Sequence, residues 1–212
     1  MKSRRIIFSF LILLALAAGT PAHALVLEDL QKRFESIPVL RCEFQQEKQI
    51  HGIDKPLKSR GELLVAREAG LFWNQKKPFE NTLLMNEGVL FQRIAGQPPQ
   101  IITAEKQPQL FQLNRLLTGL FRADRAMLEK NFTTSFSEEG GRWKIVLSPR
   151  EAPLDKIFRR ITLSGEENFK TAIFEDAQGD LTTITFSNFK MSPPTLTAAE
   201  KEIFSQIPPL RE

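Results

Sequence analysis

The sequence of 212 residues contains no Tyr, a single Cys and only two His. Because Cys42 has no second cysteine to pair with, an intramolecular disulfide is excluded. Leu40, Cys42 and Phe44 alternate with polar residues, as in a strand with one buried face. We therefore expect a buried, inert thiol, with a reactive thiol as the alternative.

Catalytic and metal chemistry has few residues to use. His51 is the one histidine after residue 24, so catalytic arrangements that need His, and metal sites of the His/Cys type, lack partners. Walker and Gly-x-Gly-x-x-Gly motifs are absent. The acidic pairs at 138–139 and 166–167 fall in expected hairpin loops rather than in a cleft. We predict no catalytic residue, no metal site and no cofactor, although a carboxylate-only mechanism stays open.

The chain has no apolar run long enough for a comfortable membrane span of about 20 residues. Its longest run, 6–18, follows Lys2, Arg4 and Arg5 and precedes Ala22-His23-Ala24. This order is typical of a secretory signal peptide, with an uncleaved signal anchor as the alternative. We expect residues 1–24 to be removed. Because Leu25, and not a cysteine, stands directly after the cleavage site, we expect an exported protein without a lipid anchor.

Net positive charge also becomes small once this segment is set aside. The whole chain carries +4, and residues 25–212 carry +1, from 26 basic and 25 acidic residues. A charge this small does not favour nucleic-acid binding. The remaining length suits one domain, which we assign to residues 25–212.

Alternation with a period of two dominates this domain and predicts about eleven strands with short connections. The expected strands are 39–50, 57–66, 71–74, 79–85, 89–94, 100–103, 132–137, 143–148, 157–163, 169–175 and 180–189, with a short final strand at 203–207.

Helical spacing appears in only a few places. Apolar residues predict helices at 27–34 and 108–121, a short helix is expected at 124–130, and residues 197–200 fit a capping box. The fold class is therefore mainly β with a few helices (α+β). An apolar sheet face must be covered, so the sheet closes into a barrel or curls into a half-barrel with helices across its concave side. The inserted helix at 108–121 favours the half-barrel with a helical lid.

The aromatic residues are mostly Phe. Residues 25–212 keep 15 Phe and two Trp, and Phe has no polar group that needs a partner when buried. Such an interior suits contact with hydrocarbon, and ordinary core packing is the alternative.

Several short motifs follow one another in an order found in one known family. They are Phe44-Gln45-Gln46, Gly61-Glu62-Leu63, Arg67 followed by Phe72-Trp73, Pro78 and Glu80, Asn86-Glu87-Gly88, and Phe204 with Pro208-Pro209. The sequence resembles LolA, the periplasmic carrier of outer-membrane lipoproteins, most specifically over residues 44–91. It departs from the family pattern at Glu68, Leu71, Phe72 and Glu87 and in having no Tyr, so a divergent carrier for another lipid is a further possibility.

The resemblance implies an incomplete antiparallel barrel of about eleven strands under a helical lid, with a cavity for acyl chains. It implies that Arg67 holds the lid shut through hydrogen bonds to lid backbone; a solvated arginine is the alternative. Alternation and the resemblance together give the expected lining residues: Phe44, Leu63, Val65, Leu71, Trp73, Leu83, Met85 and Phe91 on the sheet, and Leu110, Leu113, Leu117 and Phe121 on the lid.

The resulting hypothesis is a monomeric periplasmic carrier that performs no covalent chemistry. Its client would be an acylated lipoprotein or lipid. The resemblance implies an inner-membrane ABC transporter such as LolCDE as donor and an outer-membrane receptor such as LolB as acceptor. The alternatives are a lipid- or lipoprotein-sensing module, an enzyme acting on lipid, and a domain that binds nothing.

Overall fold

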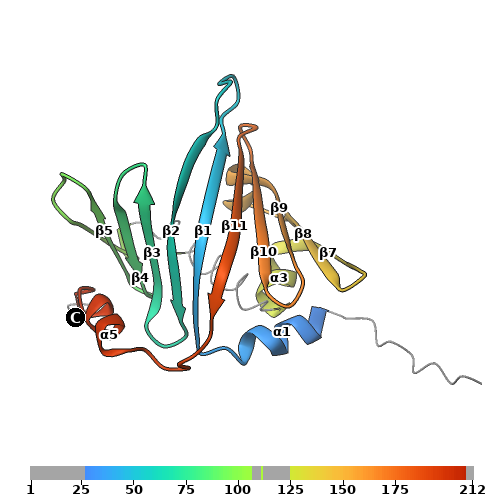
Figure 1. Ribbon diagram of the computed structural model, residues 1–212. Coiled ribbons are helices and arrows are strands. Elements are labelled where there is room, and N and C mark those ends of the chain that lie inside the picture. The colour runs from blue at the N-terminus through green and yellow to red at the C-terminus, as the bar shows by residue number, and fades with distance from the viewer. Residues whose placement is uncertain (1–26, 107–110, 112–124, 209–212) are drawn as a thin grey trace, which may run out of the picture.

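The computed structural model describes residues 27–106, 111 and 125–208 (Figure 1). In chain order its elements are α1 (Leu27–Glu35), β1 (Val39–Gln49), β2 (Leu57–Ala66), β3 (Gly70–Lys77), β4 (Asn81–Met85), β5 (Val89–Ile94), β6 (Gln100–Thr103), α3 (Arg125–Asn131), β7 (Phe132–Glu139), β8 (Arg142–Pro149), α4 (Leu154–Ile157), β9 (Phe158–Gly165), β10 (Phe169–Asp176), β11 (Leu181–Lys190) and α5 (Ala198–Phe204).

The strands among the described residues form one antiparallel sheet of eleven, in the order β6-β5-β4-β3-β2-β1-β11-β10-β9-β8-β7. Every neighbouring pair except β1–β11 consists of consecutive strands, so the sheet is built from two meanders joined where β1 pairs with β11. Its edges, β6 and β7, do not pair with each other. The predicted fold class, mainly β with an incomplete antiparallel barrel, is confirmed.

Cross-strand register determines which side chains share a face, because residues directly opposite each other in an antiparallel pair point the same way. One such row joins Leu40, Val65, Leu71, Met85 and Leu90 across five strands. We call the face that carries this row the inner face, and the opposite side of the sheet the outer face.

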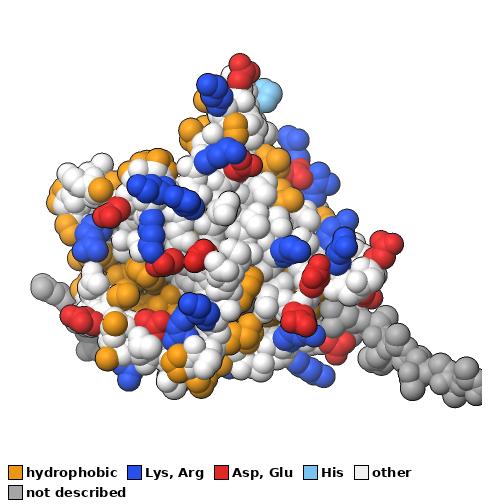
Figure 2. Space-filling model, viewed as in Figure 1, with side chains coloured by type: hydrophobic (Ala, Val, Ile, Leu, Met, Phe, Trp, Pro, Cys, Tyr) orange, Lys and Arg blue, Asp and Glu red, His pale blue; other side chains and the backbone are white. Residues whose placement is uncertain are grey.

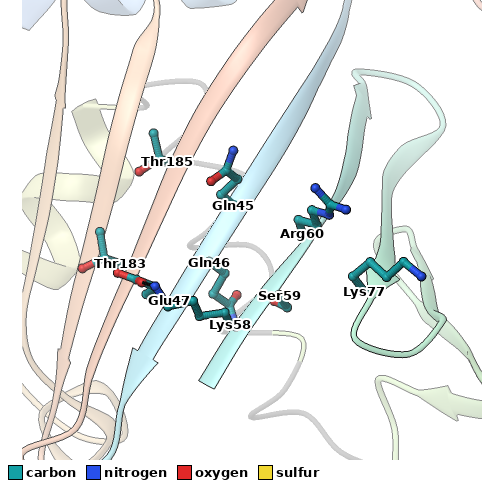
Figure 3. Close-up of a pocket in the computed structure, with 9 residues that line it drawn as sticks. All are labelled: Gln45, Gln46, Glu47, Lys58, Ser59, Arg60, Lys77, Thr183 and Thr185. Atoms are coloured by element: carbon teal, nitrogen blue, oxygen red, sulfur yellow. Dashed lines mark ion pairs between the residues drawn. The ribbon is translucent and has the colours of Figure 1, made fainter. Parts of the chain in front are cut away.

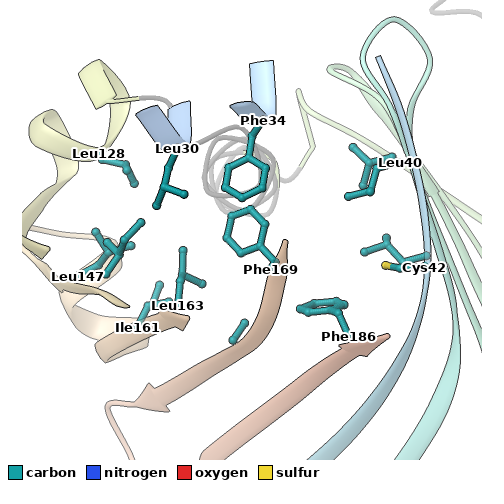
Figure 4. Close-up of a cluster of buried hydrophobic side chains, with 14 of the residues drawn as sticks. Leu30, Phe34, Leu40, Cys42, Leu128, Leu147, Ile161, Leu163, Phe169 and Phe186 are labelled. Carbon is teal, nitrogen blue, oxygen red and sulfur yellow. The ribbon is translucent and has the colours of Figure 1, made fainter. Parts of the chain in front are cut away.

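The inner face carries the main hydrophobic core, roofed by α1 and α3 (Figure 4). Phe34 of α1 stacks on Phe169 with ring centroids 4.3 Å apart and meets the edge of Trp143 at 6.1 Å. Leu30 of α1 and Leu128 of α3 are fully buried in the same cluster. Figure 4 shows side chains from both meanders converging below α1, so the sheet curls around this core.

The outer face of the first meander has a smaller apolar cluster, covered by α5. Phe204 packs there against a group from β1, β2, β4 and β5: Val39, Leu64, Ala66, Leu84 and Phe91. The predicted capping box is confirmed, because Thr197 and Glu200 hydrogen-bond each other's backbone N–H groups. The predicted strand at 203–207 is wrong. Helix α5 runs through Phe204 and a turn follows it, and Ile203, Phe204 and Ile207 pack on the outer-face cluster instead of pairing with a strand.

Other expected elements differ from the structure at their boundaries. Among them, β3 runs over Gly70–Lys77 instead of 71–74, and β4 begins at Asn81 instead of residue 79. The short helix expected at 124–130 is α3, Arg125–Asn131. The strand expected from residue 157 begins at Phe158, because the four-residue helix α4 occupies Leu154–Ile157. The helix expected at 108–121 lies outside the described residues, apart from Phe111. In the part of the chain that is described, no helix has both the length and the apolar character needed to cross a membrane.

Candidate functional site

The inner face of the first meander holds most of the predicted lining residues. Phe44 and Leu63 are each 1% exposed, and the ring of Phe44 stacks on Trp73 with centroids 3.7 Å apart. Val65 and Leu71 lie directly opposite each other on β2 and β3 and belong to the same cluster. Phe186 of β11 pairs with Phe44 and extends this apolar surface into the second meander.

The apolar surface continues toward the β6 edge. Met85, Leu90 and Phe111 form a buried cluster, with the half-buried Leu83 packed against it. Phe111 belongs to the segment predicted as the lid, and it is 1% exposed on the inner side of β4 and β5. The other predicted lid residues, Leu110, Leu113, Leu117 and Phe121, lie outside the described residues.

Among the described sheet residues predicted to line the cavity, Phe91 alone lies on the outer face, so its prediction is wrong. It pairs with Leu84 and packs under α5 on the outer face, whereas Leu90 pairs with Met85 on the inner face. Alternation could not separate the two, because both faces of β5 are buried and both residues are apolar. The signal that identifies Leu90 is the turn: Asn86 N–H donates to the Val89 carbonyl, and counting outward from that pair places Leu90 opposite Met85.

Arg67 lies in the turn between β2 and β3, where its backbone N–H donates to the Pro38 carbonyl at 3.0 Å. Its side chain is exposed and borders a hollow of about 510 Å³ formed by the α1–β1 connection, this turn and the segment before α5. Arg67 takes part in a further interaction and is not a free cation. Glu68, which stands where the family has proline, is exposed in the same turn.

Cys42 of β1 lies on the inner face and is buried in the same cluster as Phe34 and Phe44. Burial, followed by the nearby Glu43 carboxylate, raises the pKa of the thiol to about 12. The expectation of a buried cysteine is confirmed. A thiol with this pKa is protonated at neutral pH and is therefore a poor nucleophile.

The described residues offer few groups for catalysis or metal binding. His51 is exposed in the β1–β2 loop, where its backbone N–H donates to the Asp180 carboxylate. Within residues 27–106, 111 and 125–208, no group of three or more His, Cys, Asp or Glu could hold a metal ion. The apolar side chains of the inner face are packed together in the main hydrophobic core.

An open antiparallel sheet with an apolar inner face roofed by helices defines a half-barrel suited to an apolar ligand. The model of one protein family, described as outer membrane lipoprotein carrier protein LolA-like, matches residues 18–187. The chain belongs to this family.

Individual proteins are more distant. An outer-membrane lipoprotein carrier protein from Cupriavidus taiwanensis is 25% identical over 201 residues, which cover 92% of this chain and 91% of that protein. Among solved structures, a LolA superfamily protein from Nitrosomonas europaea gives a TM-score of 0.46 at 12% identity, covering 85% of this chain and 98% of the other. A DUF1329 family protein from Desulfovibrio piger gives 0.45 at 11% identity, covering 82% and 94%.

Proposed function

We propose that this protein is a periplasmic carrier that binds the acyl chains of a lipoprotein or lipid on its inner face and carries them from the inner to the outer membrane. The observation that supports this most is the continuous apolar surface from Met85 through Trp73 and Phe44 to Phe186, which crosses both meanders. Family membership supports a lipoprotein client. The carrier would work without covalent chemistry and without a cofactor.

The route and partners are part of the same proposal. Residues 1–24 would direct export and be removed, leaving residues 25–212 as a monomeric carrier. A LolCDE-like transporter in the inner membrane would load it, and a LolB-like receptor in the outer membrane would accept the client. Nucleic acid has no role in this scheme.

Binding must be reversible for transfer to succeed. Each buried CH₂ group contributes about 0.8 kcal/mol, so several acyl chains on an open apolar face would be held too tightly to release. A lid that packs onto the empty inner face competes with the ligand and lowers its net affinity. Phe111 packs in this manner on Met85 and Leu90.

Arg67 is proposed as the latch that stabilises the closed lid, since one guanidinium offers five donors to backbone carbonyls. We expect Arg67→Leu to load client normally but release it poorly to an acceptor membrane fraction. Transfer at the wild-type rate would remove Arg67 from this role.

Acyl binding itself is tested with protein purified from periplasm. Native mass spectrometry should find a bound lipid or lipoprotein, and the empty protein should bind a fluorescent fatty acid. Leu83→Ser on the inner face should weaken that binding. Phe72→Ser is the matched control, because Phe72 is similarly half-buried but lies on the outer face. Equal loss in both variants, or a protein that carries no lipid and ignores fatty acid, would contradict the proposal.

A further inference from the structure

Large apolar side chains are exposed at one end of the sheet. The antiparallel order brings together the loops between β1 and β2, β3 and β4, β5 and β6, and β10 and β11 at this end, which we call the tip end (Figure 1). Six large hydrophobic residues of the described chain are exposed. Five of them lie in or next to these loops: Ile53, Leu57, Phe79, Ile101 and Leu181.

The exposure at the tip end is substantial. Ile53, Leu57 and Phe79 are 48%, 58% and 53% exposed, respectively. Apolar atoms gather below the top of the β1–β2 hairpin and over the β3–β4 turn in Figure 2, with Lys and Arg side chains between them. Single exposed hydrophobics are ordinary, but a group at one projecting end marks an interaction surface.

The cations beside this group differ in their pairing. Lys58 pairs with Glu47 and Lys48 pairs with Asp180. Arg60 and Lys77, by contrast, lie opposite each other on β2 and β3, and neither has a carboxylate within ion-pair distance among the described residues.

These two cations border a hollow on the sheet of about 420 Å³ (Figure 3). Its other lining residues are Gln45, Gln46, Glu47, Lys58, Ser59, Thr183 and Thr185. Glu47 is the one carboxylate in this lining, and Lys58 neutralises it. The hollow therefore presents two uncompensated positive charges and several hydrogen-bonding groups, a combination that suits a phosphate group.

We propose that the tip end docks on the surface of an anionic phospholipid bilayer. Ile53, Leu57 and Phe79 enter the boundary between headgroups and acyl chains, while Arg60 and Lys77 hold lipid phosphates. Apolar contact and electrostatic attraction act together at such interfaces, and neither is sufficient alone. Three carboxylates of this end have no ion pair among the described residues and oppose docking: Asp54, Glu80 and Asp176.

A bilayer explains this surface better than a folded partner protein does. The exposed apolar residues come from separate loops and project separately rather than forming one flat patch. Side chains that project separately can enter a fluid bilayer interface, which needs no complementary shape. The proposal goes beyond acyl-chain carriage, because it concerns the tip-end loops and two cations on the outer face. Leu57, at the start of β2, is the one of these docking residues that shares the inner face.

Vesicle flotation with the client-free protein tests the proposal. We expect the protein to float with vesicles of phosphatidylcholine and phosphatidylglycerol, much less with phosphatidylcholine alone, and less again at high salt. A triple variant, Ile53→Ser with Leu57→Ser and Phe79→Ser, should partition about tenfold more weakly. Arg60→Gln with Lys77→Gln should lose about fivefold per cation, or about 25-fold together.

Matched controls come from the opposite end of the sheet. Met191→Ser removes an exposed apolar side chain there, and Lys32→Gln with Lys144→Gln removes two exposed cations. These controls should float like the wild type, and all variants should keep the wild-type melting temperature. No flotation on anionic vesicles, or equal losses in the controls, would overturn the proposal. Flotation that requires a membrane protein in the vesicles would assign the surface to a protein partner instead. Because no client is present, the result is independent of fatty-acid binding by the inner face.

Discussion

Protonation of Glu200 should loosen α5 from the outer face of the sheet. Arg41 of β1 donates from Nε and Nη2 to the two Glu200 carboxylate oxygens, at 2.5 and 2.7 Å. The same guanidinium donates to the carbonyls of Pro193 and Thr195, so it holds the whole segment that leads into α5. Glu200 also accepts the Thr197 N–H in the capping box. One carboxylate thus joins the helix start to the centre of the sheet.

The size of the effect follows from the carboxyl group's pKa. Hydrogen bonds from Arg41, and then from Thr197, lower the pKa of Glu200 from 4.5 to about 2. This difference corresponds to about 3 kcal/mol if no solvent intervenes. The side chains of Arg41 and Glu200 are 16% and 17% exposed, and solvent screening reduces the expected contribution to about 1–2 kcal/mol.

The direction with pH is fixed by the lowered pKa. The folded protein binds this proton less readily than the unfolded chain does, so the stabilisation is complete above pH 4.5 and disappears as the pH falls through the folded value. Denaturant unfolding should therefore show Glu200→Gln costing about 1–2 kcal/mol at pH 6 and less than half of that at pH 3.

Glu202→Gln is the matched control for this measurement. Glu202 is exposed on the same helix and belongs to no ion pair among the described residues. Its replacement should change stability by less than about 0.5 kcal/mol at either pH. If Glu200→Gln costs no more than Glu202→Gln at pH 6, or costs the same at pH 6 and pH 3, the reasoning is refuted. A double-mutant cycle with Arg41→Met isolates the pair itself.

Two other predictions concern single positions in the first meander. Cys42 should not react with a thiol reagent at pH 8 in the native state and should react fully after unfolding, because its thiol is buried with a pKa of about 12; rapid native-state labelling would contradict this. Gly61→Ala should cost about 3 kcal/mol or more, or prevent folding, because an added Cβ would lie 1.9 Å from the Asn74 carbonyl oxygen. Gly52→Ala is the comparison: its φ of +80° strains alanine, but nothing lies within 4 Å, so the cost should be about 1 kcal/mol. If thermal melts gave the two variants the same loss of stability, close packing at Gly61 would not be the cause.

Much of the fold was predictable because most strands bury one face. On β2, Leu63 and Val65 alternate with residues of the other face, and the structure places both on the inner face as expected. Alternation failed on β5, because α5 covers the outer face of that strand. Both faces are therefore buried, and both carry apolar residues, Leu90 on one and Phe91 on the other. A strand buried on both sides carries no period-two signal.

The ion pair between Arg41 and Glu200 was not predictable from the sequence, for a different reason. In the pattern of β1, Arg41 looks like an ordinary solvent-facing residue, and its partner lies 159 positions later. The capping box gave the start of α5, but no local signal indicated where that helix would pack. The inward direction of Leu63 and Val65 on β2 followed from local pattern, whereas the covering of the outer face depends on tertiary contacts.

The seam between β1 and β11 has a consequence for how the chain folds. The first meander, β1–β6, and the second, β7–β11, are each made of hairpins between neighbouring strands. Within the sheet, only the seam pairs strands of the two meanders, and it brings Phe44 against Phe186. A chain delivered amino end first can build the first meander early but cannot complete the sheet until its last strand arrives. Contacts between such distant residues form slowly, so the aromatic surface of β1 and β2 stays open to other apolar molecules during synthesis.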